Sequence, residues 1–326
     1  MKLLIKLVHR SSLNMQLICV FFIPLGLVFS LYFDFFPTET IKSITSDNFN
    51  TIVVFLLLYV SSHVLRIVRL FTLMIEKKVS LRDLFAIYFL TSWVNLFLPY
   101  KTGEIFRVFG FGSISGSLRK GIVVIWIERF FDALVLLFLI IPYLIYSKSP
   151  LVVMPIVLVL ILFVLFTIFF FLEFPFSKKY LNKFIISHSK TRKGVRILKA
   201  TQIIENIYED MKALIRGRVS LILFISLMIW FLELWSVSYL FDFFSLNSLV
   251  GNFMILINES FMTTLKYNLN LLNAYRFLSI WTITILAIVS LILIVRRKPN
   301  WSNLFQKKSK ERCYKLSDTY YEQQGE

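Results

Sequence analysis

Cysteine and histidine are scarce in this chain of 326 residues, which has two of the first and three of the second. Cys19 lies inside an apolar run and Cys313 in a polar tail, so we expect no disulfide between them. His9, His63 and His188 lie far apart without a partner at metal-ligand spacing, and we expect them to be interfacial or exposed. The sequence therefore predicts no metal site and no cofactor.

Glycine is also scarce, with 10 copies, and no Walker loop is present. The glycines between positions 110 and 116 lack the G-x-G-x-x-G spacing and follow no strand, which excludes a dinucleotide site. No Ser/His/Asp or Cys/His arrangement of a nucleophilic enzyme is recognisable. The sequence thus favours a transporter-like protein and leaves an enzyme as an open alternative.

Acidic residues are few: the chain has 19 Asp and Glu and 36 Lys and Arg, which gives a net charge of +17. In a soluble protein this charge could indicate nucleic-acid binding. Here Lys and Arg cluster between apolar runs, as they do in cytoplasmic loops beside anionic headgroups. Hydrophobic residues make up 57% of the chain, and the mean hydropathy of +0.74 is too high for a soluble domain. We therefore predict an integral membrane protein with no nucleic-acid partner.

Six apolar segments are long enough to cross a bilayer core, which needs about 20 residues. The first follows a basic start, as in a signal peptide. It is long, lacks a small-x-small cleavage signal and is followed by further apolar runs, so we predict a retained helix. The predicted spans are Leu13–Phe33, Thr51–Phe71, Gly121–Tyr146, Leu151–Leu172, Val219–Phe241 and Tyr275–Val295.

Two more apolar stretches are shorter and interrupted by polar residues. One runs from Leu84 through Pro99 to about Ile114, and the other from Leu249 to about Leu272. Basic residues place both ends of the first stretch on the cytoplasmic side, so each stretch is a re-entrant hairpin or a pair of short helices. We predict an all-α integral membrane protein with about six transmembrane helices and two broken segments, or up to eight spans.

The chain divides into a polytopic transmembrane domain over residues 1–298 and a polar cytoplasmic tail over residues 299–326. Both termini and the basic loop of about residues 174–218 are predicted to be cytoplasmic, in a multi-pass protein of the plasma membrane. Between Leu198 and Leu214, apolar residues recur at helical spacing, which predicts an amphipathic helix. That helix either packs under the bundle or contacts lipid at the membrane surface.

The first broken stretch carries the most informative residues. Pro99 stops the preceding helix, and a helix that begins near Gly103 would direct free amide groups at the break. Glu104 and Arg107 are three residues apart on one helical face and can pair. We predict that the break receives a lipid phosphate, with charge supplied by Arg107 and Lys101. The alternative is an interfacial turn with a solvated ion pair.

Three ionisable residues, Glu128, Arg129 and Asp132, interrupt the third predicted span. Glu128 lies ~12 Å along the helix from Lys120, a depth at which a charged group costs roughly 3 kcal/mol. Glu128 and Asp132 share one face, whereas Arg129 points about 100° away and should seek an acid on another element, such as Glu104. These residues either belong to the site or only lock helices together. The predicted headgroup-binding residues are Asn95, Pro99, Lys101, Gly103, Glu104, Arg107, Glu128, Arg129 and Asp132.

Five further charged residues are secondary candidates. Arg66 and Arg69 lie at the inner end of the second predicted span, where long cationic side chains can snorkel to water. Glu233 lies ~21 Å into the fifth span and needs a partner. The candidates for that partner are Arg276 and Glu259.

These residues resemble the pattern of the lysylphosphatidylglycerol synthase transmembrane-region family, a group of flippase-like membrane proteins. The matching residues are Arg66, Arg69, Val79-Ser-Leu-Arg82, Asn95, Pro99, Gly103-Glu104, Arg107, Glu128-Arg129, Asp132 and Trp230-Phe-Leu-Glu233. The resemblance implies a role in moving a lipid, or a lipid-linked aminoacyl or sugar group, between leaflets. In two respects we expect the chain to depart from the family: the segment around Glu259 lacks the usual loop glycines, and we expect no soluble aminoacyl-transferring domain. We therefore do not expect the chain to make lysyl-lipid by itself.

Three functions remain open. The favoured one is a flippase-like protein that binds and moves an anionic phospholipid or a polyprenyl-phosphate lipid, with envelope-synthesis enzymes as partners. The second is a membrane-embedded transferase, or its accessory subunit, in envelope glycolipid or polysaccharide synthesis, with Glu128 or Asp132 as general base. The third is a scaffold whose intramembrane charges serve only assembly. The identity of the lipid, the direction of movement and the oligomeric state are not predicted.

Overall fold

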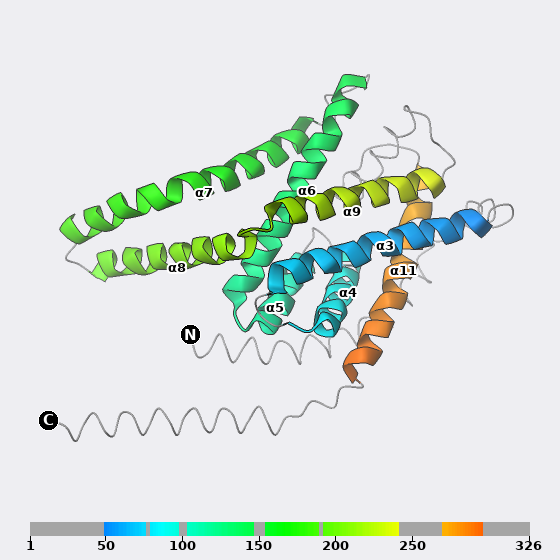
Figure 1. The fold of residues 1–326 in the computed structure, drawn as a ribbon, viewed down its shortest axis with the longest axis horizontal. Coiled ribbons are helices and arrows are strands. Elements are labelled where there is room, and N and C mark those ends of the chain that lie inside the picture. Colours follow the sequence, from blue (N-terminus) through cyan, green and yellow to red (C-terminus); the bar gives the residue numbers. More distant parts are fainter. Residues whose placement is uncertain are drawn as a thin grey trace.

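The computed structural model describes residues 49–75, 79–97, 103–146, 154–188, 192–240 and 269–295. All regular structure in these ranges is helical, which confirms the predicted all-α class (Figure 1). The helices are α3 (Phe49–Met74), α4 (Leu81–Phe97), α5 (Gly103–Ser115), α6 (Leu118–Tyr146), α7 (Met154–His188), α8 (Arg192–Ile215), α9 (Val219–Leu240) and α11 (Leu269–Val295). The predicted first span, the second broken segment up to residue 268 and the tail lie outside the described residues.

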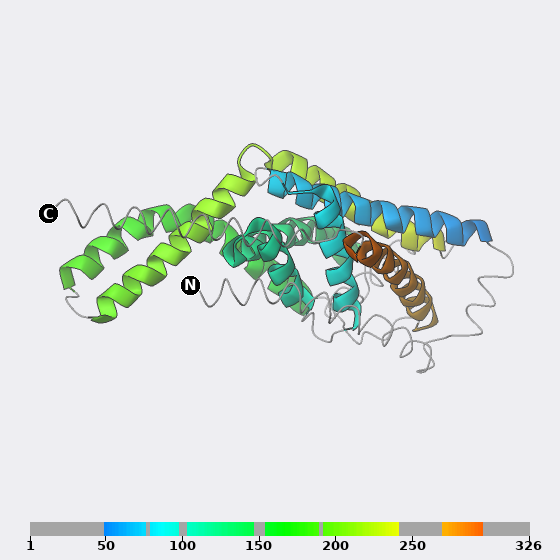
Figure 2. The ribbon, with the colours of Figure 1, turned by 90° about the horizontal axis from the view of Figure 1, so that it is seen from below.

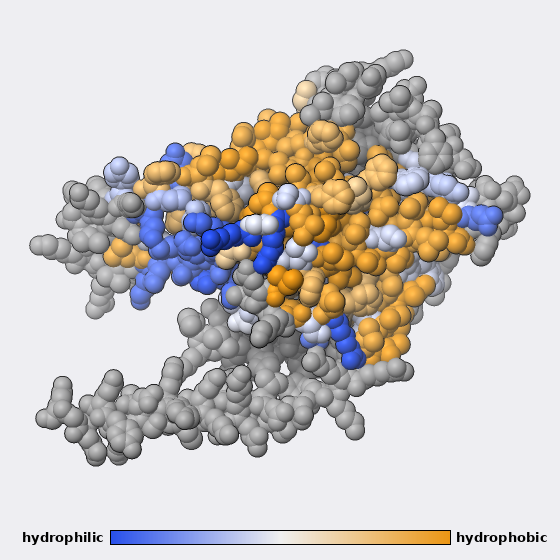
Figure 3. Space-filling view, viewed as in Figure 1, coloured by the Kyte–Doolittle hydropathy of each residue, from blue (hydrophilic) through white to orange (hydrophobic). Residues whose placement is uncertain are grey.

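Three of these helices, α3, α7 and α9, are long and apolar enough to cross a membrane. The helices α6 and α11 coincide with the third and sixth predicted spans. Large apolar side chains are exposed on the surface of these helices, among them Leu158, Leu162 and Phe169 of α7. Figure 3 shows apolar surface over the middle of the molecule and hydrophilic surface gathered at one end, around α8. Such a surface suits contact with lipid chains.

Helices α3 and α9 lie side by side and run antiparallel (Figures 1 and 2). Their direction follows from side-chain pairs: Ser62 of α3 contacts Glu233 of α9, and Arg69, further along α3, contacts Ser226, earlier in α9. These four polar and charged residues of two apolar helices therefore meet where the helices pack together. This pairing positions one wall of the candidate site.

Helices α4 and α5 form the predicted broken segment as two short helices, and the break falls within residues 98–102, which are not described. Gly103 at the start of α5 packs closely on α4, because a Cβ there would lie 2.6 Å from the Cβ of Asn95. Gly116, with φ of 71°, ends α5 in a left-handed conformation that favours glycine. The chain then folds back, so that Gly121 of α6 lies against Gly112 of α5.

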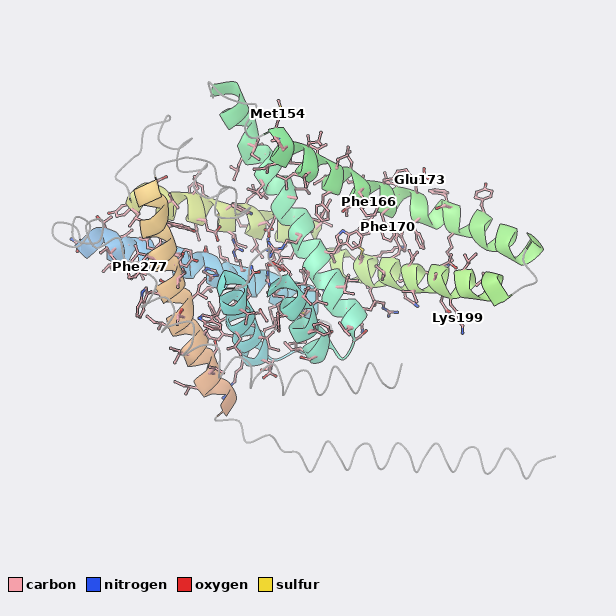
Figure 4. The ribbon with its side chains drawn as sticks, turned by 180° about the vertical axis from the view of Figure 1, so that it is seen from behind. Met154, Phe166, Phe170, Glu173, Lys199 and Phe277 are labelled. Atoms are coloured by element: carbon pink, nitrogen blue, oxygen red, sulfur yellow. The ribbon has the colours of Figure 1, made fainter. Side chains whose placement is uncertain are left out.

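Helix α7 continues to His188, well beyond Leu172, where the fourth span was predicted to end. The apolar run ends at that point, but the helix is prolonged by packing on α8. Phe170 and Phe174 of α7 contact the ring of Tyr208 of α8. Figure 4 shows Phe170 on the side of α7 that faces α8, whereas Lys199 of α8 points away from α7.

Helix α8 confirms the amphipathic helix predicted in the basic loop. Its Met211 and Leu214 are buried in the same core cluster as residues of α3, α4, α5 and α6. This part of α8 therefore packs under the bundle, which is the first of the two predicted alternatives. An ion pair between Arg119 and Asp210, with an N–O distance of 2.6 Å, joins α6 to α8.

Candidate functional site

Six charged side chains from α3, α5 and α6 form a closed ring in which arginines and acids alternate. We refer to Arg107, Glu104, Arg129, Asp132, Arg69 and Glu128, in this order, as the charge ring. The N–O distances around it are 3.4 Å (Arg107–Glu104), 2.5 Å (Glu104–Arg129), 3.5 Å (Arg129–Asp132), 2.6 Å (Asp132–Arg69), 2.8 Å (Arg69–Glu128) and 2.9 Å (Glu128–Arg107). The sequence predicted the contact of Arg129 with Glu104, and the structure adds the contacts of Arg69 and Arg107 with the acids of α6.

The deep half of the ring follows from helix geometry. Glu128 and Asp132 are one turn apart on α6 and face α3, as their spacing predicts. The guanidinium of Arg69 spans both, with Nη1 donating to Asp132 and Nη2 to Glu128. Nη1 also donates to the hydroxyl of Ser226 on α9 at 2.8 Å. Because Arg69 exposes 0% of its side chain, the prediction that it snorkels to water is wrong.

The α5 side of the ring begins at the helix that starts at Gly103, where the sequence predicted one. Glu104 lies in the first turn, where the helix dipole favours an acid. Arg107 reaches back to Glu104 and across to Glu128, and its guanidinium lies 5.5 Å from the ring centre of Tyr88. The predicted pairing of Arg129 with Glu104 is confirmed at 2.5 Å.

The charge ring is unevenly buried. Arg69 and Glu128 expose 0% of their side chains, and Asp132 and Arg107 expose 5% each. Glu104 exposes 22% and Arg129 exposes 36%, so we call this pair the Glu104–Arg129 corner. Glu104 Oε2 and Arg129 Nε have no hydrogen-bond partner among the described residues. The corner is therefore the most exposed part of the ring, while its two unpaired atoms are themselves buried.

A separate ion pair lies one turn along α3, where Arg66 binds Glu233 of α9 at 2.5 Å and Ser62 also contacts that carboxylate. The sequence predicted Arg276 or Glu259 as the partner of Glu233. In the described residues the partner is instead Arg66, because the antiparallel packing of α3 and α9 brings it opposite Glu233, whereas Glu259 and the side chain of Arg276 are not described. Arg66 exposes 16% of its side chain, so it pairs inside the protein instead of snorkelling.

The remaining predicted site residues are only partly described. Asn95 lies beside Gly103, and its Oδ1 is buried without a hydrogen-bond partner in the described part of the chain. Pro99 and Lys101 lie in the break, and Glu259 in residues 241–268, all outside the described residues. Arg276 lies on α11, and its side chain is not described.

Sequence reasoning missed His63 and Tyr88. His63 was expected to be interfacial or exposed, but it is buried, and its Nδ1 lies 2.7 Å from the Tyr88 hydroxyl. That pair connects α3 to the aromatic ring that packs on Arg107. A signal was available, because His63, Arg66 and Arg69 recur every three residues along one helical face.

The arrangement can do two things chemically. A closed set of alternating charges holds α3, α5 and α6 together, since removing one partner of a buried pair costs roughly 3–5 kcal/mol. A corner with free acceptor and donor atoms can also exchange its internal ion pair for contacts with a charged ligand. Within the described residues no group of His, Cys, Asp and Glu is arranged to hold a metal ion.

Comparison with family models identifies the family of this chain. The model of the family described as lysylphosphatidylglycerol synthase TM region matches residues 16–257, a range that contains the whole charge ring. No curated protein and no solved structure matches the chain.

Proposed function

The chain belongs to the lysylphosphatidylglycerol synthase TM-region family, and from this premise we propose that it binds the phosphorylated headgroup of a membrane lipid at the Glu104–Arg129 corner and moves that lipid between leaflets. The lipid is a phospholipid or a polyprenyl-phosphate lipid. The observation that carries the proposal is the partial exposure of this corner in an otherwise buried charge ring.

Arg129 is the cation best placed to receive a phosphate. Its side chain is the most exposed of the three arginines in the charge ring. Guanidinium groups bind phosphate through paired N–H donors, which makes arginine well suited to this contact. Arg107 was predicted to engage phosphate directly, but it is almost fully buried, so in our proposal it acts by holding Glu104 and Glu128.

Movement of a headgroup through the bilayer requires a path that keeps its charge compensated. The charge ring and the Arg66–Glu233 pair provide compensated charges on α3, α5, α6 and α9. The corner lies at the first turn of α5, beside the N-terminal end of that helix, whose dipole favours an anionic group. We propose that the phosphate of the headgroup enters on this side of α5.

Reconstitution into liposomes tests the proposal. Purified protein would be inserted into vesicles that contain fluorescent phospholipids or a polyprenyl-phosphate lipid, and a membrane-impermeant quencher would report the outer-leaflet fraction. We expect faster equilibration of at least one phosphorylated lipid than in protein-free vesicles. Rates equal to those of protein-free vesicles for the whole panel would contradict translocation.

Two arginines of α6 provide a matched comparison in the same assay. Arg129 and Arg119 expose the same 36% of their side chains, and each pairs with one acid on another helix. Arg129→Gln should abolish the protein-dependent rate, whereas Arg119→Gln should preserve it. Equal loss in both variants would indicate a general effect of removing an arginine from α6.

A further inference from the structure

We infer that the headgroup is zwitterionic and carries a primary ammonium close to its phosphate, as an ethanolamine phosphate diester does. This inference rests on the proposed function, because it assigns the chemical class of the ligand at the Glu104–Arg129 corner. It follows from the charge balance of the site and from the atoms that the corner leaves unused.

The described charges of the site cancel. Four arginines face four acids, so the net charge is 4 − 4 = 0. They are Arg66, Arg69, Arg107, Arg129, Glu104, Glu128, Asp132 and Glu233, and each has at least one ion-pair partner. Among the described residues of the site, every cation therefore already has an acidic partner. A phosphate alone would displace Glu104 from Arg129 and leave that carboxylate with only its longer contact to Arg107, at 3.4 Å.

A ligand with both charges avoids this cost. Its phosphate can bind Arg129 while its ammonium binds Glu104, so that one internal ion pair is replaced by two pairs to the ligand. Meanwhile Arg129 can keep its contact with Asp132, and Glu104 its contact with Arg107. Every charge stays paired at a depth where an unpaired one is costly.

The unused atoms indicate that the cationic group must donate hydrogen bonds. Glu104 Oε2 and Asn95 Oδ1 are buried and lack partners in the described part of the chain. Asn95 packs on Gly103, the residue before Glu104, so the two oxygens belong to one region. An oxygen of a carboxylate or an amide only accepts. A primary ammonium offers three N–H donors, whereas the trimethylammonium of choline offers none.

The test is competitive binding to the purified full-length protein in detergent. The probes are phosphatidylethanolamine, phosphatidylcholine and phosphatidylglycerol with identical acyl chains, and the bound fraction is read by native mass spectrometry. We expect phosphatidylethanolamine to bind at least about fivefold more tightly than either competitor. Soluble glycerophosphoethanolamine should compete only at far higher concentration, and competition at equal concentration would overturn the assignment to a lipid.

The variant Glu104→Gln gives the sharper result. It removes the carboxylate that we assign to the ammonium and leaves Arg129 without its closest acid, so the preference should shift at least about fivefold toward phosphatidylglycerol. Asp210→Asn is the matched control. Asp210 exposes 19% of its side chain, and it pairs with Arg119 of α6, the helix that also carries Arg129. That variant should keep the wild-type preference.

The outcomes separate the two proposals. Binding that is lost in Arg129→Gln but favours phosphatidylglycerol in the wild type would overturn the zwitterionic headgroup and support the lipid site. Equal binding of phosphatidylcholine and phosphatidylethanolamine would overturn the requirement for N–H donors. No Arg129-dependent binding of any lipid would contradict the proposed function itself.

Discussion

Arg69 of α3 and Glu128 of α6 lie 2.8 Å apart, and neither exposes any of its side chain. This pair is the innermost link of the charge ring, and Arg69 also binds Asp132 at 2.6 Å. Two helices that would otherwise meet only through apolar packing are thus joined by a guanidinium with two carboxylates. The remaining ring members extend this link to α5 and to the exposed corner.

The first prediction concerns stability at this innermost link. Arg69→Met should lower the free energy of unfolding by roughly 3–5 kcal/mol, because Asp132 and Glu128 lose their buried partner. Thermal unfolding in detergent measures the effect. Arg119→Met, at a pair that is one-third exposed on its arginine side, should cost about 1 kcal/mol or less.

A second substitution separates lost pairing from lost packing. In the Arg69→Met background, Asp132 is the acid left worst paired, since its other contact, to Arg129, is 3.5 Å long. Adding Asp132→Asn should therefore recover part of the lost stability. If the double variant is less stable than Arg69→Met alone, the carboxylate is not the source of the cost.

The second prediction is that exchanging the two charges of the Glu104–Arg129 corner does not restore the stability lost in the single variants. In an isolated pair, swapping the two residues restores the attraction. In the charge ring, Glu104→Arg combined with Arg129→Glu would place the new arginine beside Arg107 and the new glutamate beside Asp132. We expect the double variant to be no more stable than either single variant, as measured by thermal unfolding.

The pair Arg119–Asp210 is the control for this exchange, because no other acid or base joins it in the described residues. The swap Arg119→Asp with Asp210→Arg should be more stable than either single substitution. Recovery of stability at the corner as well would show that Glu104 and Arg129 act as an isolated pair, contrary to the closed ring.

The third prediction concerns the close approach of α5 and α6. A Cβ at Gly121 would lie 2.7 Å from the backbone nitrogen of Gly112, so Gly121→Ala forces the two helices apart and should destabilise the protein by about 1–3 kcal/mol. A Cβ at Gly112 would lie 3.1 Å from the Cα of Leu118, so Gly112→Ala should cost less. Thermal unfolding of both variants shows which substitution destabilises the protein more. A stabilising Gly121→Ala would contradict this packing.

The sequence predicts local features of the site well. Helix spacing places Glu128 and Asp132 on one face, and the depth and direction of Arg129 identify Glu104 as its partner on another helix. Gly103 marks the start of α5. Each of these inferences depends on residues close along the chain, or on one charged residue that needs a partner on another helix.

The partners set by tertiary packing could not be predicted in this way. Arg69 meets Glu128 and Arg66 meets Glu233 only because α3 packs against both α6 and α9, an arrangement that hydropathy does not encode. The true end of α7 was missed for a related reason. Beyond Leu172 the helix is stabilised by α8, so its length depends on a contact and not on its own apolar run.

The most direct test of the Glu104–Arg129 corner as a headgroup site is the lipid that co-purifies with the protein, identified and quantified by mass spectrometry. We predict that the wild type and Arg119→Gln retain the same phosphorylated lipid in similar amounts, and that Arg129→Gln retains at least about tenfold less. Equal retention by Arg129→Gln, with the same headgroup composition as the wild type, would contradict the account.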